Sequence, residues 1–222
     1  MTDLVKRILN SPDAPRQLEA LQQAMADERR RRHEFYEWVT EDIKAEFIQG
    51  EIVIHSPVKK RHLNASELLS TLLSVFTRIT GAGRIGIEKM MIALTRNDYE
   101  PDICFFSDER AAQFHDDQLL FPAPDFVVEI LSRSTAGNDR GIKKVDYAAH
   151  GIREYWIVDP NRQCIEQYYL PTENATEYFP PKTFRMGEDI ESRVIKGFVI
   201  PVAAVFDSTA NVEALQNLLK NN

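Results

Sequence analysis

The chain contains 222 residues and is 43% hydrophobic, which is enough apolar material for one sizeable domain with a buried core. Its formal net charge of −7 argues against a protein that coats nucleic acid non-specifically, because that affinity comes from many lysines and arginines; a local basic groove stays compatible with this charge. Residues 1–17 carry no apolar leader, and no stretch approaches about 18 consecutive apolar residues, so the sequence predicts neither secretion nor membrane insertion.

Residues 1–34 are predicted to form a helical N-terminal extension. The run Ser11-Pro12-Asp13 supplies a helix start, and apolar residues then recur at helical spacing, at Leu18, Leu21 and Met25. So narrow an apolar stripe suits packing either on the helix's own domain or on a second subunit, and the sequence leaves both open, including a homodimer. The aromatic residues of 35–38 are expected to form the transition into the next element.

A hairpin and a core-facing helix are predicted next. Residues 47–54 have the pattern of two short strands joined at Gly50. A helix is then expected to run to about Thr80, with His62 on its first turn and four residues facing the core: Ala65, Leu69, Leu72 and Phe76. The basic clusters at 29–33 and 59–62 are expected to be solvated helix ends or turns rather than a track for phosphates.

The middle of the chain predicts further strands, over residues 85–87, 90–94 and 101–106. Pro101 suits the first residue of a strand, and Asp102 follows it where the strand emerges from a loop, a position from which a side chain can reach a cleft. The two cysteines, Cys104 and Cys164, lie far apart in strand-like runs, so we expect small core residues in a cytoplasmic protein rather than a disulfide.

One carboxylate interrupts the most apolar run of the chain. Residues 126–131 read Phe-Val-Val-Glu-Ile-Leu, which predicts a strand buried on both faces, as at the centre of a helix-covered sheet. Glu129 then points into cover, where an ionised carboxylate is costly unless a partner compensates its charge. We therefore expect a cation or a lysine beside it.

The segment after this strand predicts a crossover. Residues 132–139 have the composition of a loop, and a helix should begin near Asp139 and end at Gly151, before a strand over residues 155–158. Ile142, Val145 and Ala149 are expected to form its buried stripe. A strand, helix and strand of this length normally join parallel neighbours, which would let Lys143 reach back towards Glu129.

The last quarter of the chain gives no sign of catalysis. The sequence predicts a strand over residues 163–170, a short strand near 190–195 and a helical stretch over 202–219. No internal repeat, low-complexity tract or glycine-rich phosphate loop is present.

Together these motifs resemble the Uma family of endonucleases, within the PD-(D/E)XK restriction-endonuclease-like superfamily. The resemblance covers residues 35–206 and rests on Pro101-Asp102, on Glu129 inside an apolar strand, on residues 139–147 with Lys143, and on the run Glu154 to Pro160. The hairpin at Gly50, His62 at a helix start, and Ile200-Pro201 leading to Phe206 also match the family's pattern.

The resemblance implies that Asp102 and Glu129 hold a divalent cation, with the main-chain carbonyl of Ile130 as a further ligand. Oxygen donors of this kind suit Mg²⁺ or Mn²⁺, and no paired cysteines or histidines favour zinc. The superfamily expects lysine two residues after the glutamate, where this chain has Leu131. The Uma family takes its lysine from the following helix, which implies Lys143.

Three further residues are candidates for accessory roles. Lys144 is the second choice for the catalytic lysine. Tyr147 is expected to pack with a hydrogen-bonded hydroxyl, and His62 is expected to be structural rather than a phosphate or metal contact. The structural alternatives for the main site are a strand-start cap for Asp102, a lysine partner for Glu129 without metal, and a solvated surface position for Lys143.

The resemblance and the element pattern together predict an α/β fold with a central mixed β-sheet flanked by helices, comprising the domain at residues 35–206, the extension at 1–34 and a C-terminal helix at 207–222. The implied function is a metal-dependent endonuclease that hydrolyses phosphodiester bonds of nucleic acid, with DNA as the expected substrate and partner. Two alternatives stay open. One is a non-catalytic nucleic-acid-binding or assembly protein with the same fold, and the other is a phosphodiesterase acting on small molecules, which the acidic charge favours and which should show a closed pocket.

Overall fold

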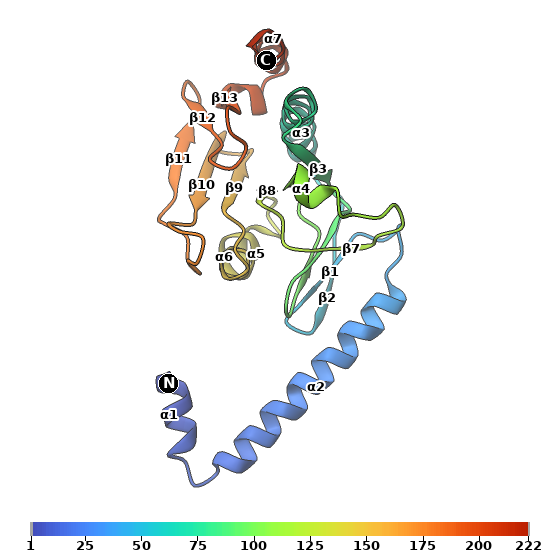
Figure 1. Ribbon diagram of the computed structural model, residues 1–222, viewed down its shortest axis with the longest axis vertical. Helices are drawn as coiled ribbons and strands as arrows, with labels where there is room; N and C mark the ends of the chain where they lie inside the picture. Colours follow the sequence, from blue (N-terminus) through green and yellow to red (C-terminus); the bar gives the residue numbers. More distant parts are fainter. Residues whose placement is uncertain (1, 222) are drawn as a thin grey trace.

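A six-stranded sheet forms the centre of the molecule, as the computed structural model of residues 2–221 shows (Figure 1). Its strand order is β11-β10-β9-β8-β6-β3. The bounds are β3 Gly83–Ile87, β6 Ile103–Ser107, β8 Phe126–Ile130, β9 Glu154–Asp159, β10 Cys164–Tyr169 and β11 Lys182–Arg185. Strands β8 and β9 are parallel and the other neighbours are antiparallel, which confirms the mixed sheet.

The side chains of β8 alternate between two buried faces of this sheet. Phe126, Val128 and Ile130 pack in the core formed with α3 (Lys60–Thr80) and α7 (Ser208–Asn221). Val127 packs on the opposite face in the core that contains Tyr147. By the same alternation Glu129 points to this second face, so the strand is covered on both sides and its carboxylate is buried, as predicted.

A second, smaller sheet was not predicted from the sequence. Its strand order is β2-β1-β5-β4-β7, with bounds β1 Ala45–Ile48, β2 Glu51–Ile54, β4 Met91–Ala93, β5 Asp98–Tyr99 and β7 Leu120–Phe121. The predicted hairpin is its β1–β2 pair, and Gly50 has a positive φ of 86° at the turn, where a side chain would meet Arg31. This sheet brings the hairpin to the site described below.

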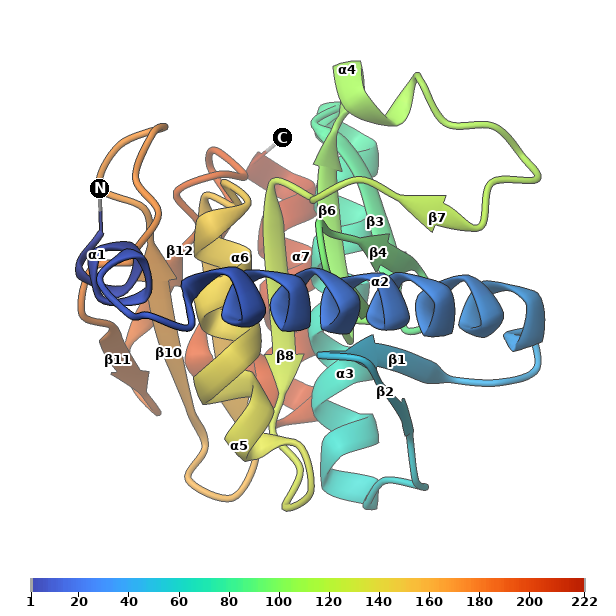
Figure 2. The same ribbon diagram turned by 90° about the horizontal axis from the view of Figure 1, so that it is seen from below.

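The N-terminal helices differ from the expectation. Helix α2 (Ala14–Trp38) includes the aromatic residues of 35–38 in its last turns, so these residues are helical and Phe35 is fully buried. The Arg32 guanidinium binds both oxygens of Asp98, at 2.7 and 2.6 Å. The other half of α2 runs away from the sheets, and helix α1 (Asp3–Leu9) turns back beyond its far end (Figures 1 and 2). Leu18 and Leu21 are exposed.

The helical crossover between β8 and β9 begins three residues earlier than predicted and has a different buried face. It consists of α5 (Ala136–Asn138), a π-helical segment η1 (Asp139–Lys143) and α6 (Lys144–Ala149). Val145 is 59% exposed and Ala149 is exposed too, so the predicted apolar stripe is wrong at these two residues, whereas Ile142 is partly buried and packs against the core as predicted. The buried residues are instead Asp139, Lys143, Tyr147 and Ala148, because the wider π turn shifts the phase of the helix.

The C-terminal part contains a short strand pair and two separate helices. The predicted strand near 190–195 is only β12 (Asp189–Glu191), which pairs with β13 (Val199–Pro201). The predicted helix over 202–219 is divided into a 3₁₀ turn η2 (Val202–Val205) and α7, with Asp207 between them capping α7. The remaining helix, α4, spans Asp108–Ala111.

Two further expectations concern the chain as a whole. Cys104 and Cys164 are both buried and free, as predicted. Over residues 2–221, no helix has both the length and the apolar character that a membrane span requires.

Candidate active site

Asp102 and Glu129 lie on adjacent strands of the main sheet. Asp102 directly precedes β6, whose Ile103 pairs with Val128 of β8, so the two acidic residues are neighbours across the strand pair. Asp102 is also locked to β8 by a hydrogen bond, because the main-chain N–H of Ile130 donates to Asp102 Oδ2 at 2.7 Å. The side chains of Asp102 and Glu129 are 9% and 5% exposed, so both carboxylates are largely shielded from solvent.

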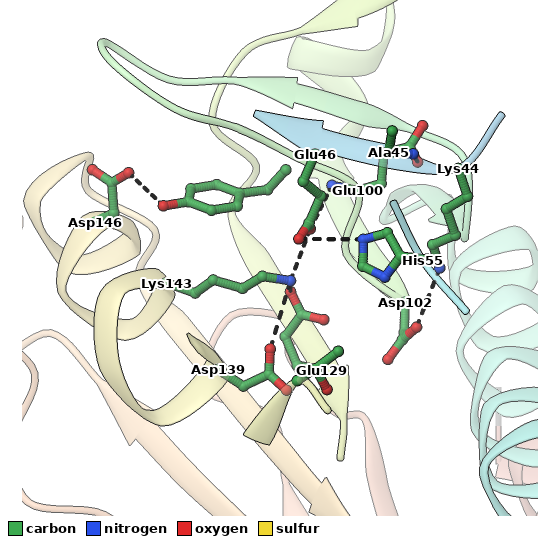
Figure 3. Close-up of polar contacts among 12 residues, drawn as sticks. Lys44, Ala45, Glu46, His55, Glu100, Asp102, Glu129, Asp139, Lys143 and Asp146 are labelled. Atoms are coloured by element: carbon green, nitrogen blue, oxygen red, sulfur yellow. Dashed lines mark hydrogen bonds and ion pairs between the residues drawn. The ribbon is translucent and has the colours of Figure 1, made fainter. Parts of the chain in front are cut away.

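Lys143 reaches this site from η1, as the sequence predicted. Its Nζ lies 3.0 Å from Glu129 Oε1, 2.8 Å from Glu46 Oε1 and 3.6 Å from Asp139 Oδ1 (Figure 3). Burial alone would lower the pKa of Lys143, but the surrounding carboxylates raise it well above its ordinary value. The side chain is therefore a fixed cation and not a proton acceptor.

Of the accessory candidates on this crossover, Tyr147 contacts Glu129, whereas Lys144 contacts Tyr168. The Tyr147 hydroxyl donates to Glu129 Oε1 at 2.8 Å, and its ring packs edge-on against Tyr99 and Tyr155. Lys144 lies over the ring of Tyr168, 5.8 Å from its centroid, on a different side of the helix. The geometry therefore favours Lys143 over Lys144 and gives Tyr147 the packing and hydrogen-bonding role that we expected.

His62 and Lys44 lie beside Asp102. His62 Nε2 is 3.4 Å and Lys44 Nζ 3.5 Å from Asp102 Oδ1. Burial opposes ionisation of Asp102, but these two neighbours and the Ile130 N–H outweigh it and lower the pKa of the carboxyl. Asp102 is therefore a carboxylate at neutral pH, whether or not another cation is present.

Sequence reasoning missed four residues of the site: Lys44, Glu46, His55 and Asp139. Glu46 is 1% exposed in β1, where it is the one polar side chain in a strand of otherwise apolar residues. This is the same signal that identified Glu129, but the predicted hairpin begins at Phe47 and therefore does not include Glu46. His55 directly follows β2, and Asp139, which we had read only as a helix start, lies one helical turn before Lys143.

Most of these side chains line a pocket of about 360 Å³. Its wall includes residues of the β1–β2 hairpin, the start of α3, the turn after β3 at Glu88, the strand ends at Asp102 and Glu129, and the crossover up to Lys143. The site residues among them are Lys44, Glu46, His55, His62, Asp102, Glu129, Ile130 and Lys143. Three hydroxyl-bearing residues of the loop after β8 add polar groups to the wall: Ser132, Ser134 and Thr135.

Comparison with known proteins places this arrangement in a family. Residues 32–203 match the Uma2 family, which is described as "Putative restriction endonuclease". The chain belongs to the Uma2 family. The crystal structure of a "putative nuclease" of the DUF820 group from Anabaena variabilis has the same fold, with a TM-score of 0.67 at 16% identity, over 81% of this chain and 97% of that one. The fold is therefore the predicted α/β, restriction-endonuclease-like one.

One sequence relative adds no functional information. The uncharacterized protein sll1609 of Synechocystis is 28% identical over 131 residues, which are 56% of this chain and 71% of that protein.

The Uma2 match begins at residue 32 and ends at residue 203. It therefore contains every site residue named above and leaves out α1, most of α2 and α7.

The charge balance of this Uma2 site suits a bound cation. Four carboxylates, defined here as the carboxylate cluster, are buried together: Glu46, Asp102, Glu129 and Asp139. Burial raises the pKa of Glu129 to about 8, and Asp139 and Asp102 add to the rise against the opposing effect of Lys143. The site thus carries more acidic groups than Lys143 and Lys44 can neutralise. Without a further cation, Glu129 therefore keeps its proton up to a pH of about 8.

The donors are hard oxygens, which fit Mg²⁺ or Mn²⁺. Among residues 2–221 there is no group of three or more His, Cys, Asp or Glu side chains arranged to hold a metal. An ion at Asp102 and Glu129 would therefore need main-chain and water oxygens as well, which is how Mg²⁺ is commonly held in proteins.

Proposed function

We propose that this Uma2 protein is a nuclease that hydrolyses phosphodiester bonds of DNA with the help of Mg²⁺ or Mn²⁺. The observation that carries the proposal is the convergence of Asp102, Glu129 and Lys143 in one pocket from two adjacent strands and the crossover between β8 and β9. Family membership supports the nuclease class. The metal, the DNA substrate and the roles of the residues are our inference.

Each residue has a role that its contacts suit. Asp102 and Glu129 would hold the cation together with the carbonyl of Ile130, and the cation, when bound, would neutralise phosphate charge and lower the pKa of a water. The Ile130 N–H and His62 fix the orientation of Asp102. Lys143 keeps its proton, so it contributes a positive charge towards the phosphate as negative charge develops there.

A cleavage assay with two isosteric variants tests this proposal. Purified protein is incubated with duplex DNA, single-stranded DNA and RNA in the presence of Mg²⁺, Mn²⁺ or a chelator. Wild-type protein should cleave DNA only with metal, and Asp102→Asn and Glu129→Gln should each reduce the rate by about 100-fold or more, because each loses a carboxylate of the site.

The matched controls are Asp108→Asn and Glu51→Gln, which make the same changes at exposed positions. Both should cleave as wild type does. Cleavage that persists in chelator, or that is unchanged in Asp102→Asn, would contradict the metal-dependent nuclease. Binding of nucleic acid without cleavage in any metal would favour the non-catalytic alternative.

The size of the pocket favours a second candidate, a phosphodiesterase that acts on small molecules. A volume of about 360 Å³ is within the range of small-ligand sites, and the buried carboxylates Glu46, Asp102 and Glu129 line it. Hydrolysis of bis(p-nitrophenyl) phosphate or a cyclic dinucleotide, with no cleavage of any polymer, would favour this candidate.

We also infer a cytoplasmic location. Cys104 and Cys164 are free thiols, which suits a reducing compartment.

A further inference from the structure

The β1–β2 hairpin adds a histidine to the pocket. His55 directly follows β2, and its main-chain N–H donates to the carbonyl of Lys44 at 3.1 Å, which continues the antiparallel pairing of Ala45 with Ile54. The hairpin therefore fixes the backbone of His55. Its side chain is 16% exposed and lines the same pocket as Asp102 and Glu129.

Glu46 connects this histidine to Lys143. Glu46 Oε2 lies 3.3 Å from His55 Nε2, while Glu46 Oε1 binds Lys143 Nζ at 2.8 Å and accepts the Glu100 N–H at 3.0 Å (Figure 3). Glu46 is therefore held on its other oxygen, so its position beside the imidazole is fixed. Among residues 2–221, His55 Nε2 has no hydrogen-bond partner, so the Glu46 carboxylate 3.3 Å away is the group placed to attract a proton on this nitrogen. A histidine beside a buried carboxylate whose side chain lines a pocket is an arrangement suited to proton transfer.

The reaction needs a proton donor that the proposed roles do not supply. When a phosphodiester is hydrolysed, the departing nucleoside oxygen must be protonated. Lys143 and Lys44 pair with carboxylates, which raise the pKa of each lysine, so both hold their protons. His62 orients Asp102, a proposed ligand of the cation, and its side chain is 8% exposed, against 16% for His55. His55 is the remaining histidine that lines the pocket in the described part of the chain.

We propose that His55 is a catalytic general acid of this site and that Glu46 is the residue that positions it. The inference rests on the nuclease function proposed above. In the step, a water oxygen forms a new bond to phosphorus and its proton goes to solvent. The bond from phosphorus to the leaving oxygen breaks with its electron pair on that oxygen, which takes the proton of His55. The imidazole regains a proton from solvent.

The test compares two leaving groups in His55→Gln. Each DNA oligonucleotide has either the natural bridging oxygen or a bridging sulfur at one phosphodiester, with separate substrates for the 3′ and the 5′ position. A thiolate leaves without protonation, so cleavage of the phosphorus–sulfur bond needs no general acid. His55→Gln should reduce the rate on the oxygen substrate by about 10²- to 10⁴-fold and the rate on the sulfur substrate by less than about tenfold.

The controls separate chemistry from folding. His33→Gln changes an exposed histidine of α2 and should cleave both substrates as wild type does. Mn²⁺ binding, measured by titration calorimetry, should be unchanged in His55→Gln. Glu46→Gln should show the same preference for the sulfur substrate, which a purely structural defect would not produce, and Glu46→Asp should recover part of the oxygen rate.

The outcomes distinguish this inference from the function beneath it. Equal losses on the oxygen and sulfur substrates, or no loss on either, would overturn the role of His55 while leaving the nuclease intact. Wild-type protein that cleaves neither substrate would overturn both. If His55→Gln is unfolded by circular dichroism, His55→Asn is measured on the same pair of substrates, and the same ratios decide.

Discussion

Lys143 is the main counter-charge of the carboxylate cluster. It contacts Glu46, Glu129 and Asp139, and it is 2% exposed. Lys143→Met should therefore lower the free energy of unfolding by about 3–5 kcal/mol, because it leaves buried carboxylates without a partner. Urea unfolding at pH 7 measures the change. Lys144→Met is the matched control and should change it by less than about 0.5 kcal/mol.

Glu129→Gln should have the opposite effect on stability. The change leaves Lys143 paired with Glu46 and Asp139, so no buried cation is orphaned, and it removes a carboxyl that is costly to ionise. The metal-free variant should be at least as stable as wild type and should lose Mn²⁺ binding. Thermal unfolding and calorimetric titration measure the two properties. A large loss of stability with intact metal binding would make Glu129 a structural partner of Lys143.

The raised pKa of Glu129 predicts how stability depends on pH. Between pH 4.5 and about 8 the folded protein holds a proton on Glu129 that the unfolded chain has lost, so the free energy of unfolding should fall as pH rises through this range. This loss of stability is absent below pH 4.5 and complete above about pH 8. Urea unfolding of metal-free wild type and of Glu129→Gln across this range isolates the loss. The free energy of unfolding of the variant should exceed that of wild type by more and more as pH rises.

At the scale of single elements, α2 has one half bound to the body and one half free. Glu28 binds Arg96, Arg32 binds Asp98, and Phe35 is buried, whereas α1 has no buried residue. Deletion of residues 1–13 should therefore leave both cleavage and the melting temperature unchanged within error. Arg32→Ala should lower the melting temperature, because Asp98 is then buried without its guanidinium. A truncated protein without activity would show that α1 or the segment that joins it to α2 serves the site.

Local patterns predicted β8 well and the following helix poorly. The apolar run around Glu129 determines a buried strand through its alternation alone, and the need for a compensating cation follows from the same residue. The phase of the crossover does not follow from apolar spacing, because η1 departs from the helical period on which that spacing depends. The crossover topology predicted that Lys143 could reach Glu129 and the family resemblance implied its role, while Val145 was assigned to the wrong face.

At the scale of the whole molecule, the second sheet is what sequence reasoning could not supply. Its strands are two to four residues long, and β1 pairs with β5 about fifty residues later, so no local period reveals it. Asp102 and Glu129 come from neighbouring strands of the main sheet and Lys143 from the crossover after β8, and all three were predicted. Glu46 and His55 enter from the other sheet, and only the tertiary structure brings them to Lys143. The division into residues 1–34, 35–206 and 207–222 stays a prediction, although α2 runs through the first of these boundaries.

The π-helical segment makes the site sensitive to chain length as well as to residue identity. Adding one residue to η1, whose wide turn already holds more residues than an α turn, would turn everything after it by about 100° around the helix axis, because an α-helix has about 3.6 residues per turn. Insertion of one alanine after Arg140 should therefore swing Lys143 out of the carboxylate cluster and abolish cleavage and Mn²⁺ binding together. Gly141→Ala should be silent in both assays, since a methyl group there meets nothing within 4 Å. A chain that tolerates an added methyl group at this point but not an added residue has its spacing, and not its side chain, under constraint.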